Sequence, residues 1–304
     1  MNAGMPTSRR TQQAGENAKH RQQWKSTLNT YCSPVFGKVS VQAIDVALVT
    51  KVLEPIWATK PETASRLRGR IEAILDWAKV RSLRTGENPA RWRGHLDHLL
   101  PAPNKVRKVK HHAALPYEQV GALMIQLREC DGIAARALEF AILTAARTNE
   151  VIGTRWDEID FAAKVWTVPE SRMKAYREHR VPLSDAALAI LQAMRSLRQN
   201  EYVFAGDRRS VLSNMALLMT LRRMGRGDVT AHGFRSTFRT WAAERTGFPR
   251  EVVEAALAHA IGNKVEAAYQ RGDMFEKRRR LMHAWGQFCV DVLSAGKIVP
   301  LRIA

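Results

Sequence analysis

Apolar residues recur at intervals of three and four along the first hundred residues, which is the spacing of one face of an α-helix. The pattern is clearest in residues 61–82, and residues 40–57 and 19–31 share it. The other, polar face of the helix predicted over residues 61–82 carries Arg66, Arg70 and Arg81. We therefore predict a small helical bundle over residues 1–100, with residues 1–18 disordered.

The hydrophobic pattern changes its period in the second part of the chain. Residues 117–129 predict an amphipathic helix, and residues 134–146 are apolar nearly all round, which predicts a buried helix. Between residues 154 and 184 the β-forming residues instead stand in short runs between polar turns: Trp156, Ile159, Val165, Trp166, Val168, Val181 and Leu183. We predict three short antiparallel strands in this stretch.

Helical spacing returns after the strands. Ser184 and Asp185 can cap a helix, and we expect the chain to stay largely helical to about residue 293. The apolar face of the capped helix comprises Leu188, Leu191 and Met194. A last helix over residues 275–293 has an apolar face, formed by Leu281, Trp285, Phe288 and Val292, that either packs within the chain or docks on a neighbouring protomer. The expected fold class is mainly α with a small antiparallel β-sheet.

Residues 101–116 have the composition of a linker, with three prolines, four Lys or Arg and no acid. We place the domain boundary there, between a first domain over residues 1–100 and a second over residues 117–293, followed by a tail over residues 294–304. The basic residues of the linker either form a solvated tether or lie along phosphates: Lys105, Arg107, Lys108 and Lys110.

The net charge indicates a polyanionic partner. The 304 residues contain 48 Lys and Arg against 29 Asp and Glu, a formal net charge of +19, and residues 1–112 hold 20 of these basic residues against 8 acids. No apolar stretch approaches the roughly 20 residues that span a bilayer, and the first 20 residues contain no signal peptide. Three distant cysteines favour reduced thiols. We expect a cytoplasmic, nucleoid-associated protein that does not contact membranes.

Several residues of the second domain could take part in catalysis, although each of them alone has a commoner structural explanation. Arg147 lies at the carboxyl end of the buried helix, where the helix dipole favours a cation. Glu150 could fix its guanidinium through a charge-assisted hydrogen bond. A histidine and an arginine three apart often form a surface pair, a histidine before a glycine is more often structural, and a lone tyrosine usually packs. Together these residues form an ordered set along the chain: Arg147, Glu150, a lysine of the strand region, His232, Arg235, His259 and Tyr269.

This ordered set resembles the tyrosine recombinase (phage integrase) family, most closely the integrases of satellite prophages and genomic islands. The resemblance runs from about residue 23 to Trp285 and is densest in residues 143–153, 172–184, 232–244 and 257–271. It implies a helical core-type DNA-binding domain followed by a tyrosine recombinase catalytic domain. It also implies an integrase that exchanges DNA strands to integrate or excise a mobile element.

The resemblance implies that Arg147 and Arg235 are the two catalytic arginines and that Tyr269 is the nucleophile. Attack by a tyrosine on a phosphodiester places extra negative charge on the non-bridging oxygens, which two guanidiniums can bind bidentately. The product is a 3′-phosphotyrosine, which a second 5′-hydroxyl can reverse. We therefore expect neither a metal nor another cofactor.

The remaining site residues are likewise carried over from the resemblance. Lys174 matches the lysine on the turn between the second and third strands, where it would protonate the leaving 5′ oxygen as general acid. His232 matches the first histidine, which together with the arginines would activate a tyrosine whose ordinary pKa is near 10. His259 matches the position held by His or Trp and would hydrogen-bond the phosphate. Glu150 matches the acid that supports the first arginine.

The implied partners are double-stranded DNA at attachment sites, three further copies in a homotetramer, and accessory DNA-bending and excision proteins. The family's amino-terminal arm-binding domain is not recognised in this sequence, either because it is absent by nature or because the start is truncated. The chain also departs from the family in Asn149, where Gly is usual, and in Tyr176, where a small residue is common. Two alternatives remain open at this stage: a catalytically silent DNA-binding remnant of an integrase, and a relaxing enzyme similar to type IB topoisomerases. Cleavage confined to one sequence would separate the integrase from both.

Overall fold

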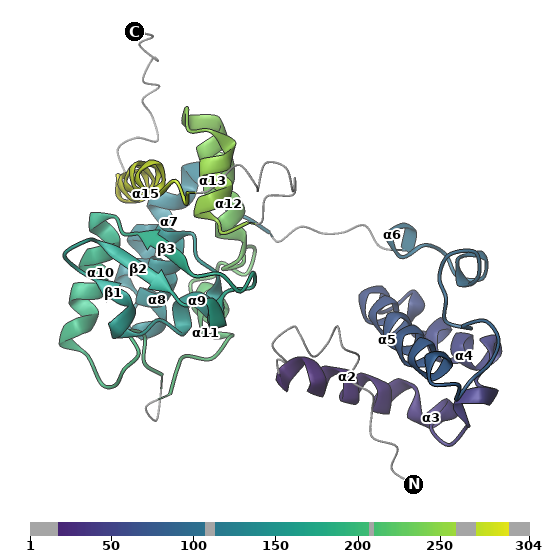
Figure 1. Ribbon diagram of the computed structural model, residues 1–304. Coiled ribbons are helices and arrows are strands. Elements are labelled where there is room, and N and C mark those ends of the chain that lie inside the picture. Colours follow the sequence, from purple (N-terminus) through teal and green to yellow (C-terminus); the bar gives the residue numbers. More distant parts are fainter. Residues whose placement is uncertain (1–17, 107–112, 207–209, 260–271, 292–304) are drawn as a thin grey trace. The chain divides into compact units, whose positions relative to one another are not determined.

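The computed structural model describes residues 18–106, 113–206, 210–259 and 272–291 (Figure 1). The chain divides into two compact units, Met1–Lys110 and His111–Ala304. The residues predicted to be disordered, 1–18, lie outside the described residues except for the last, which begins the first helix. Within the described residues, no helix combines the length and the apolar character needed to cross a membrane.

The first unit is helical, as its sequence pattern predicts. Its helices are α2 (Ala18–Tyr31), α3 (Ser33–Phe36), α4 (Val46–Trp57), α5 (Pro61–Val80) and α6 (Pro103–Val106), with short 3₁₀ turns at Val41–Ala43 and Leu96–His98. The Asp45 carboxylate accepts a hydrogen bond from the backbone N–H of Leu48 at 2.9 Å and so caps α4. The core lies chiefly between α4 and α5, where Leu53 and Leu67 are fully buried.

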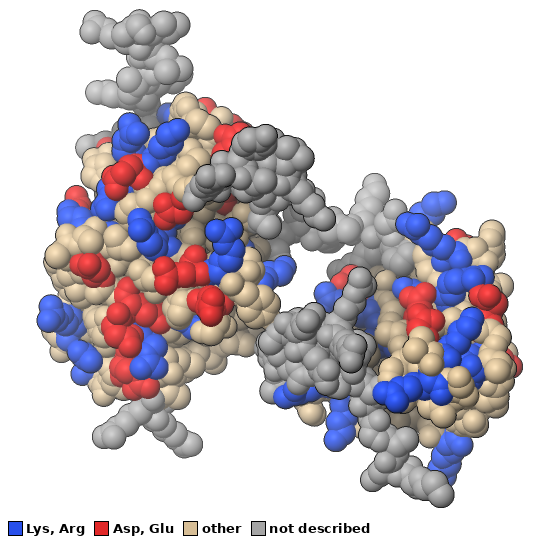
Figure 2. All heavy atoms as spheres, in the orientation of Figure 1, with Lys and Arg blue, Asp and Glu red and all other residues tan. Residues whose placement is uncertain are grey.

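The predicted exposure of Arg70 on the polar face of α5 is wrong. Its side chain is buried, with the guanidinium over the ring of Trp24 and hydrogen bonds to the Gln23 carbonyl and the Thr27 hydroxyl. Because Trp24 and Thr27 belong to α2, this arginine joins α2 to α5. The viewed face of this unit displays more Lys and Arg than Asp and Glu (Figure 2).

The predicted linker begins with residues that contact the first unit. The Trp57 indole Nε1 donates to the carbonyl of Pro101 at 2.8 Å, and Val106, at the end of α6, packs against the apolar core of this unit. Lys105 is exposed on α6. The other basic residues expected to lie along phosphates, Arg107, Lys108 and Lys110, fall outside the described residues.

The second unit is built around one buried helix. Its helices are α7 (Val120–Glu129), α8 (Ile133–Thr144), α9 (Thr148–Ile152), α10 (Asp185–Ser196), α11 (Ala216–Arg223), α12 (Gly233–Arg245), α13 (Arg250–Ala256) and α15 (Phe275–Val290). The apolar helix predicted over residues 134–146 is α8, which packs against α7, α10, α11 and α15. Ser184 caps α10 as predicted, since its hydroxyl accepts from the backbone N–H of Ala187.

The three predicted strands are present as one antiparallel sheet in the order β1-β2-β3. The strands are β1 (Ile159–Asp160), β2 (Val165–Val168) and β3 (His179–Pro182), and Trp166 of β2 pairs with both Ile159 and Val181. Trp166 is fully buried against Phe140 of α8. The confirmed fold class is therefore mainly α with a small antiparallel sheet.

The last helix, α15, packs within its own unit. The Trp285 indole Nε1 donates to the carbonyl of Ile142 at 2.8 Å, and its ring contacts Phe238, Trp241 and Phe288. Leu281 on the same face is fully buried, whereas Val292, also predicted on this face, lies outside the described residues. Of the two roles predicted for this apolar face, packing within the chain and docking on a neighbouring protomer, the structure shows packing within the chain.

The expectation that the chain stays largely helical from residue 185 to about residue 293 holds only in part. Residues 197–206 and 210–215 contain isolated bridges, Arg155 with Tyr202 and Ala205 with Val211, and no helix. Helix α13 ends at Ala256, and Ala258 adopts a left-handed conformation with φ of 48°. The carbonyl groups of Leu257 and Ala258 lie beyond this early helix end and accept hydrogen bonds from Arg147.

Candidate active site

Arg147 lies in the turn that joins α8 to α9. Ala145 ends α8 in a left-handed conformation with φ of 50°, and Arg147 follows with extended dihedral angles as the residue that precedes α9. The Glu150 carboxylate on the first turn of α9 accepts from the backbone N–H of Arg147 at 2.8 Å and from its Nη1 at 2.7 Å. The Glu150 side chain is 5% exposed and that of Arg147 22% exposed. One buried carboxylate therefore fixes both the backbone and the guanidinium of Arg147.

Arg235 comes from the first turn of α12 and is buried. Its Nη1 donates to the carbonyl of Ala145, and its Nη2 donates to the carbonyl of Leu257 at 2.6 Å. Burial, together with the nearby charge of Arg147, lowers the pKa of Arg235 to about 10, against the opposing effects of Glu150 and Glu254. Two cations held close together in a desolvated place favour an anion between them.

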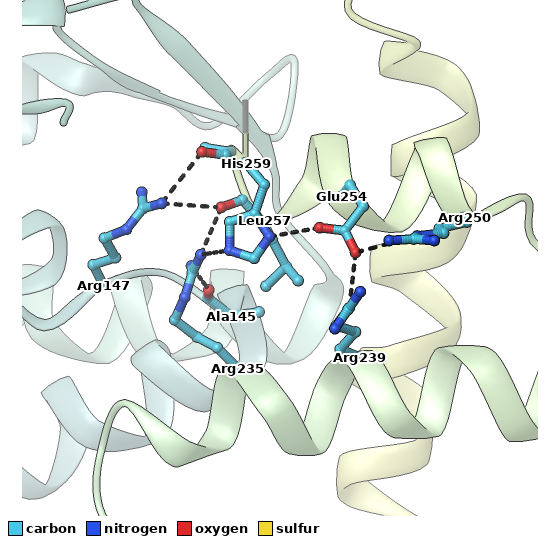
Figure 3. A network of polar contacts seen from close by, with 9 residues as sticks. Ala145, Arg147, Arg235, Arg239, Arg250, Glu254, Leu257 and His259 are labelled. Atoms are coloured by element: carbon cyan, nitrogen blue, oxygen red, sulfur yellow. Dashed lines mark hydrogen bonds and ion pairs between the residues drawn. The ribbon is translucent and has the colours of Figure 1, made fainter. Parts of the chain in front are cut away.

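The segment after α13 brings the two arginines together. The Leu257 carbonyl accepts from Arg235 and lies 3.5 Å from Nη2 of Arg147, and the Ala258 carbonyl accepts from the same Nη2 at 3.2 Å (Figure 3). These carbonyl groups are available because α13 has ended at Ala256. The guanidiniums, far apart in sequence, are thus oriented by shared backbone acceptors.

His259 directly follows these carbonyl groups and lies beside Arg235. Its Nε2 is 3.1 Å from Nη2 of Arg235, and its Nδ1 is 2.6 Å from a carboxylate oxygen of Glu254 (Figure 3). The His259 side chain remains 41% exposed. The structure therefore brings Arg147, Glu150, Arg235 and His259 into one cluster.

Lys174 and His232 lie in exposed segments of the second unit. Lys174 is exposed on the loop between β2 and β3, and His232 is exposed immediately before α12, three residues from the buried Arg235. Tyr176, in the same loop as Lys174, is exposed and has a φ of 50°. Tyr269 lies outside the described residues.

Three residues near this cluster were not selected from the sequence. Glu254 contacts His259, and Arg172 donates to the carbonyl of Glu150 at 3.1 Å and pairs with Glu158, which ties the start of the Lys174 loop to α9. His179, at the start of β3, has a pKa lowered to about 4 by burial and by the charge of Arg278. The only sequence signal for Arg172 and Glu254 is an ionisable side chain near an expected site residue: Arg172 lies two positions before Lys174, and Glu254 lies five positions before His259.

The polar groups of the described residues suit an anion better than a metal. No group of three or more His, Cys, Asp or Glu that could hold a metal ion occurs in the part of the chain that the structure describes. The cluster instead presents two guanidiniums, which can together bind the oxygens of a phosphate diester.

Comparison with known proteins places this cluster in a family context. The phage integrase central domain matches residues 8–95, and the phage integrase family matches residues 114–275. The prophage integrase IntA of Escherichia coli K12 is 35% identical over 92% of this chain, which covers 67% of IntA, and the prophage integrase IntZ is 32% identical over 96%, which covers 71% of IntZ. A lambda integrase tetramer bound to a Holliday junction has a similar fold, with a TM-score of 0.63 at 15% identity over 86% of this chain and 74% of that one.

Proposed function

This chain belongs to the phage integrase family of tyrosine site-specific recombinases, and we propose that it cuts and rejoins DNA through a covalent bond to Tyr269. The convergence of Arg147 and Arg235 on the carbonyl groups of residues 257 and 258, beside His259, carries this proposal. In acting on a phosphodiester, these cations stabilise charge that grows in the transition state.

The proposed reaction is a transesterification in two reversible steps. The phenolic oxygen of Tyr269 attacks the phosphorus, the bond to the 5′ oxygen breaks, and a 3′-phosphotyrosine forms. His232 accepts the phenolic proton, and Lys174 supplies a proton to the leaving 5′ oxygen, each a general acid or base contribution of about 10²–10⁴ in rate. Lys174 is exposed on its loop, as a proton donor to a bound strand must be, and Arg172 anchors the start of that loop.

Rejoining reverses the same chemistry with a different strand. A 5′-hydroxyl from a second duplex attacks the phosphotyrosine, releases Tyr269 and completes a strand exchange. We assign DNA binding to the basic domain of residues 1–100 together with the linker of residues 101–116, and catalysis to residues 117–293. A lambda integrase tetramer binds a Holliday junction, which supports a homotetramer here. The accessory partners that we propose are DNA-bending and excision proteins.

A suicide substrate tests this function. The wild type and Tyr269→Phe are incubated with a nicked duplex that carries the junction between the mobile element and its chromosome, and denaturing gels report covalent protein–DNA complexes. We expect a complex with the wild type on the junction and none with Tyr269→Phe or a scrambled junction. Complexes on any duplex would indicate a topoisomerase-like relaxing enzyme. Binding to the junction without a covalent complex would indicate a silent remnant and refute the proposal.

A further inference from the structure

Glu254 on α13 is the meeting point of three cationic or potentially cationic side chains. Its carboxylate accepts from Nε of Arg239 at 2.7 Å, lies 2.6 Å from Nδ1 of His259, and is 3.9 Å from Nε of Arg250 (Figure 3). The Glu254 side chain is only 19% exposed. Burial alone would raise the pKa of Glu254, yet the hydrogen bond from His259 and the charge of Arg239 hold that pKa below its ordinary value. The residue is therefore a carboxylate, which accepts hydrogen bonds and donates none.

The two neighbours of His259 determine which ring nitrogen carries the proton. Nδ1 faces the Glu254 carboxylate, an acceptor, so Nδ1 must donate. Nε2 faces Nη2 of Arg235, and a guanidinium has donors only, so Nε2 must accept. The arrangement is satisfied by the neutral Nδ1–H tautomer of His259, with Nε2 oriented toward the arginine.

The acceptor at Nε2 completes the hydrogen bonding of one guanidinium nitrogen. Nη2 of Arg235 donates one N–H to the carbonyl of Leu257 and directs its second toward His259. Nη1 donates to the carbonyl of Ala145. A planar guanidinium held at both terminal nitrogens has a fixed plane, and the orientation of its remaining donors is fixed with it.

We propose that Glu254 is a positioning residue that acts through His259: it holds the Nδ1–H tautomer, so that Nε2 accepts from Arg235 and orients that guanidinium toward the phosphate. This role rests on the proposed function. A carboxylate that orients a histidine, which in turn orients a charged group, controls chemistry without touching the reacting atoms. His259 thereby acts on Arg235 as an acceptor, and both of its ring nitrogens are engaged in the structure without DNA.

The arrangement gives Glu254→Gln a specific consequence. Arg239 donates to one carboxylate oxygen and His259 to the other. If the introduced amide keeps its oxygen toward Arg239, its NH₂ group faces Nδ1 of His259, where two donors would meet. The ring then relieves this conflict by moving its proton to Nε2, which places an N–H against Nη2 of Arg235. Removing the donor at residue 239 lets the amide turn its oxygen to His259 and restores the original tautomer.

Two measurements on the full chain test the proposal. In ¹⁵N NMR of histidine-labelled protein, the ring nitrogen shifts report which nitrogen of His259 is protonated, with His259→Gln used to assign the signals. In the suicide-substrate assay, the rate of covalent complex formation is compared among Glu254→Gln, Arg239→Met and the double variant. The control is Glu251→Gln, which removes the same charge from an exposed position on the same helix.

We expect the Nδ1–H tautomer in the wild type and the Nε2–H tautomer in Glu254→Gln. The cleavage rate should fall about 10- to 100-fold, as activity does when a metal-ligating histidine loses its outer-shell partner. The double variant should recover most of the rate and the Nδ1–H tautomer, which a residue with only a structural role would not do. An Nε2–H tautomer in the wild type would overturn the proposal, as would a Glu254→Gln rate within twofold of the Glu251→Gln rate. A wild type that binds the junction without cleaving it refutes the proposed function instead, while the NMR result still decides the tautomer.

Discussion

Replacing Glu150 by alanine should release Arg147 from its position and weaken the second unit. The substitution removes the acceptor of two hydrogen bonds, at 2.7 and 2.8 Å, from an arginine whose other contacts are the carbonyl groups of residues 257 and 258. Loss of one partner of a buried ion pair costs about 3–5 kcal/mol. Because Arg147 is 22% exposed and water can reach part of its guanidinium, we expect a loss of about 2–4 kcal/mol in the free energy of unfolding.

Native-state hydrogen exchange measures this loss in the second unit alone. The slowest backbone amides of α8, which lies at the centre of that unit, exchange through its unfolding. Their exchange should become about 30- to 700-fold faster in Glu150→Ala, since a tenfold change corresponds to about 1.4 kcal/mol. The matched control, Glu178→Ala, removes an exposed carboxylate from the loop before β3 and should change exchange less than about twofold.

The same variant should lose cleavage of the junction duplex. Displacement of a catalytic group by about 1 Å can cost 10²-fold in rate, so we expect at least that loss in covalent complex formation. The contrary result is a Glu150→Ala variant whose α8 amide exchange rates and junction cleavage rate equal those of Glu178→Ala. The carbonyl groups beyond α13 would then suffice to hold Arg147, and the role assigned to Glu150 would be refuted.

Three further predictions concern stability. The folded-state pKa of His179 is about 4, below its ordinary value near 6.5, so the unfolded chain binds a proton at this residue first as the pH falls. The wild type should therefore lose stability between about pH 6.5 and 4. Urea titrations at each pH should show a flatter dependence of the free energy of unfolding on pH for His179→Gln than for the wild type. Gly286→Ala would place a Cβ 2.5 Å from Cβ of Ser184, and should lower the free energy of unfolding by about 1–3 kcal/mol in thermal denaturation. Gly69→Ala lies within α5, where the new Cβ meets no atom within 4 Å beyond its own helix backbone. It should raise the free energy of unfolding by about 0.4–1 kcal/mol, and a loss of stability would contradict the open environment.

The sequence predicted most helices and the whole sheet, because those elements follow from local periodicity. Helix α5 begins at Pro61, as the pattern indicated, and β2 pairs with β3. Arg70 was misplaced because periodicity assigns a face and cannot foresee that Trp24 and Thr27 of another helix will enclose a guanidinium. The tertiary partner, rather than the local pattern, decides the burial of such a residue.

The site was predictable in its residue types and not in its connections. The order of Arg147, Arg235 and His259 along the chain carried the resemblance on which their assignment rests. Their orientation depends on backbone carbonyl groups, which carry no residue-specific signal, and on an early helix end with Ala258 in a left-handed conformation that alanine seldom adopts. Glu254 was missed for a related reason, since its contact with His259 crosses the end of α13 and has no regular helical spacing.

The identity of the residue that becomes joined to DNA tests the central claim most directly. The covalent complex formed by the wild type on the nicked junction duplex is digested with protease and nuclease, and mass spectrometry locates the nucleotide adduct on the chain. We predict a 3′-phosphonucleotide on the phenolic oxygen of Tyr269. An adduct on any other residue, or junction DNA that is bound by the wild type and never becomes covalently attached, would contradict the account.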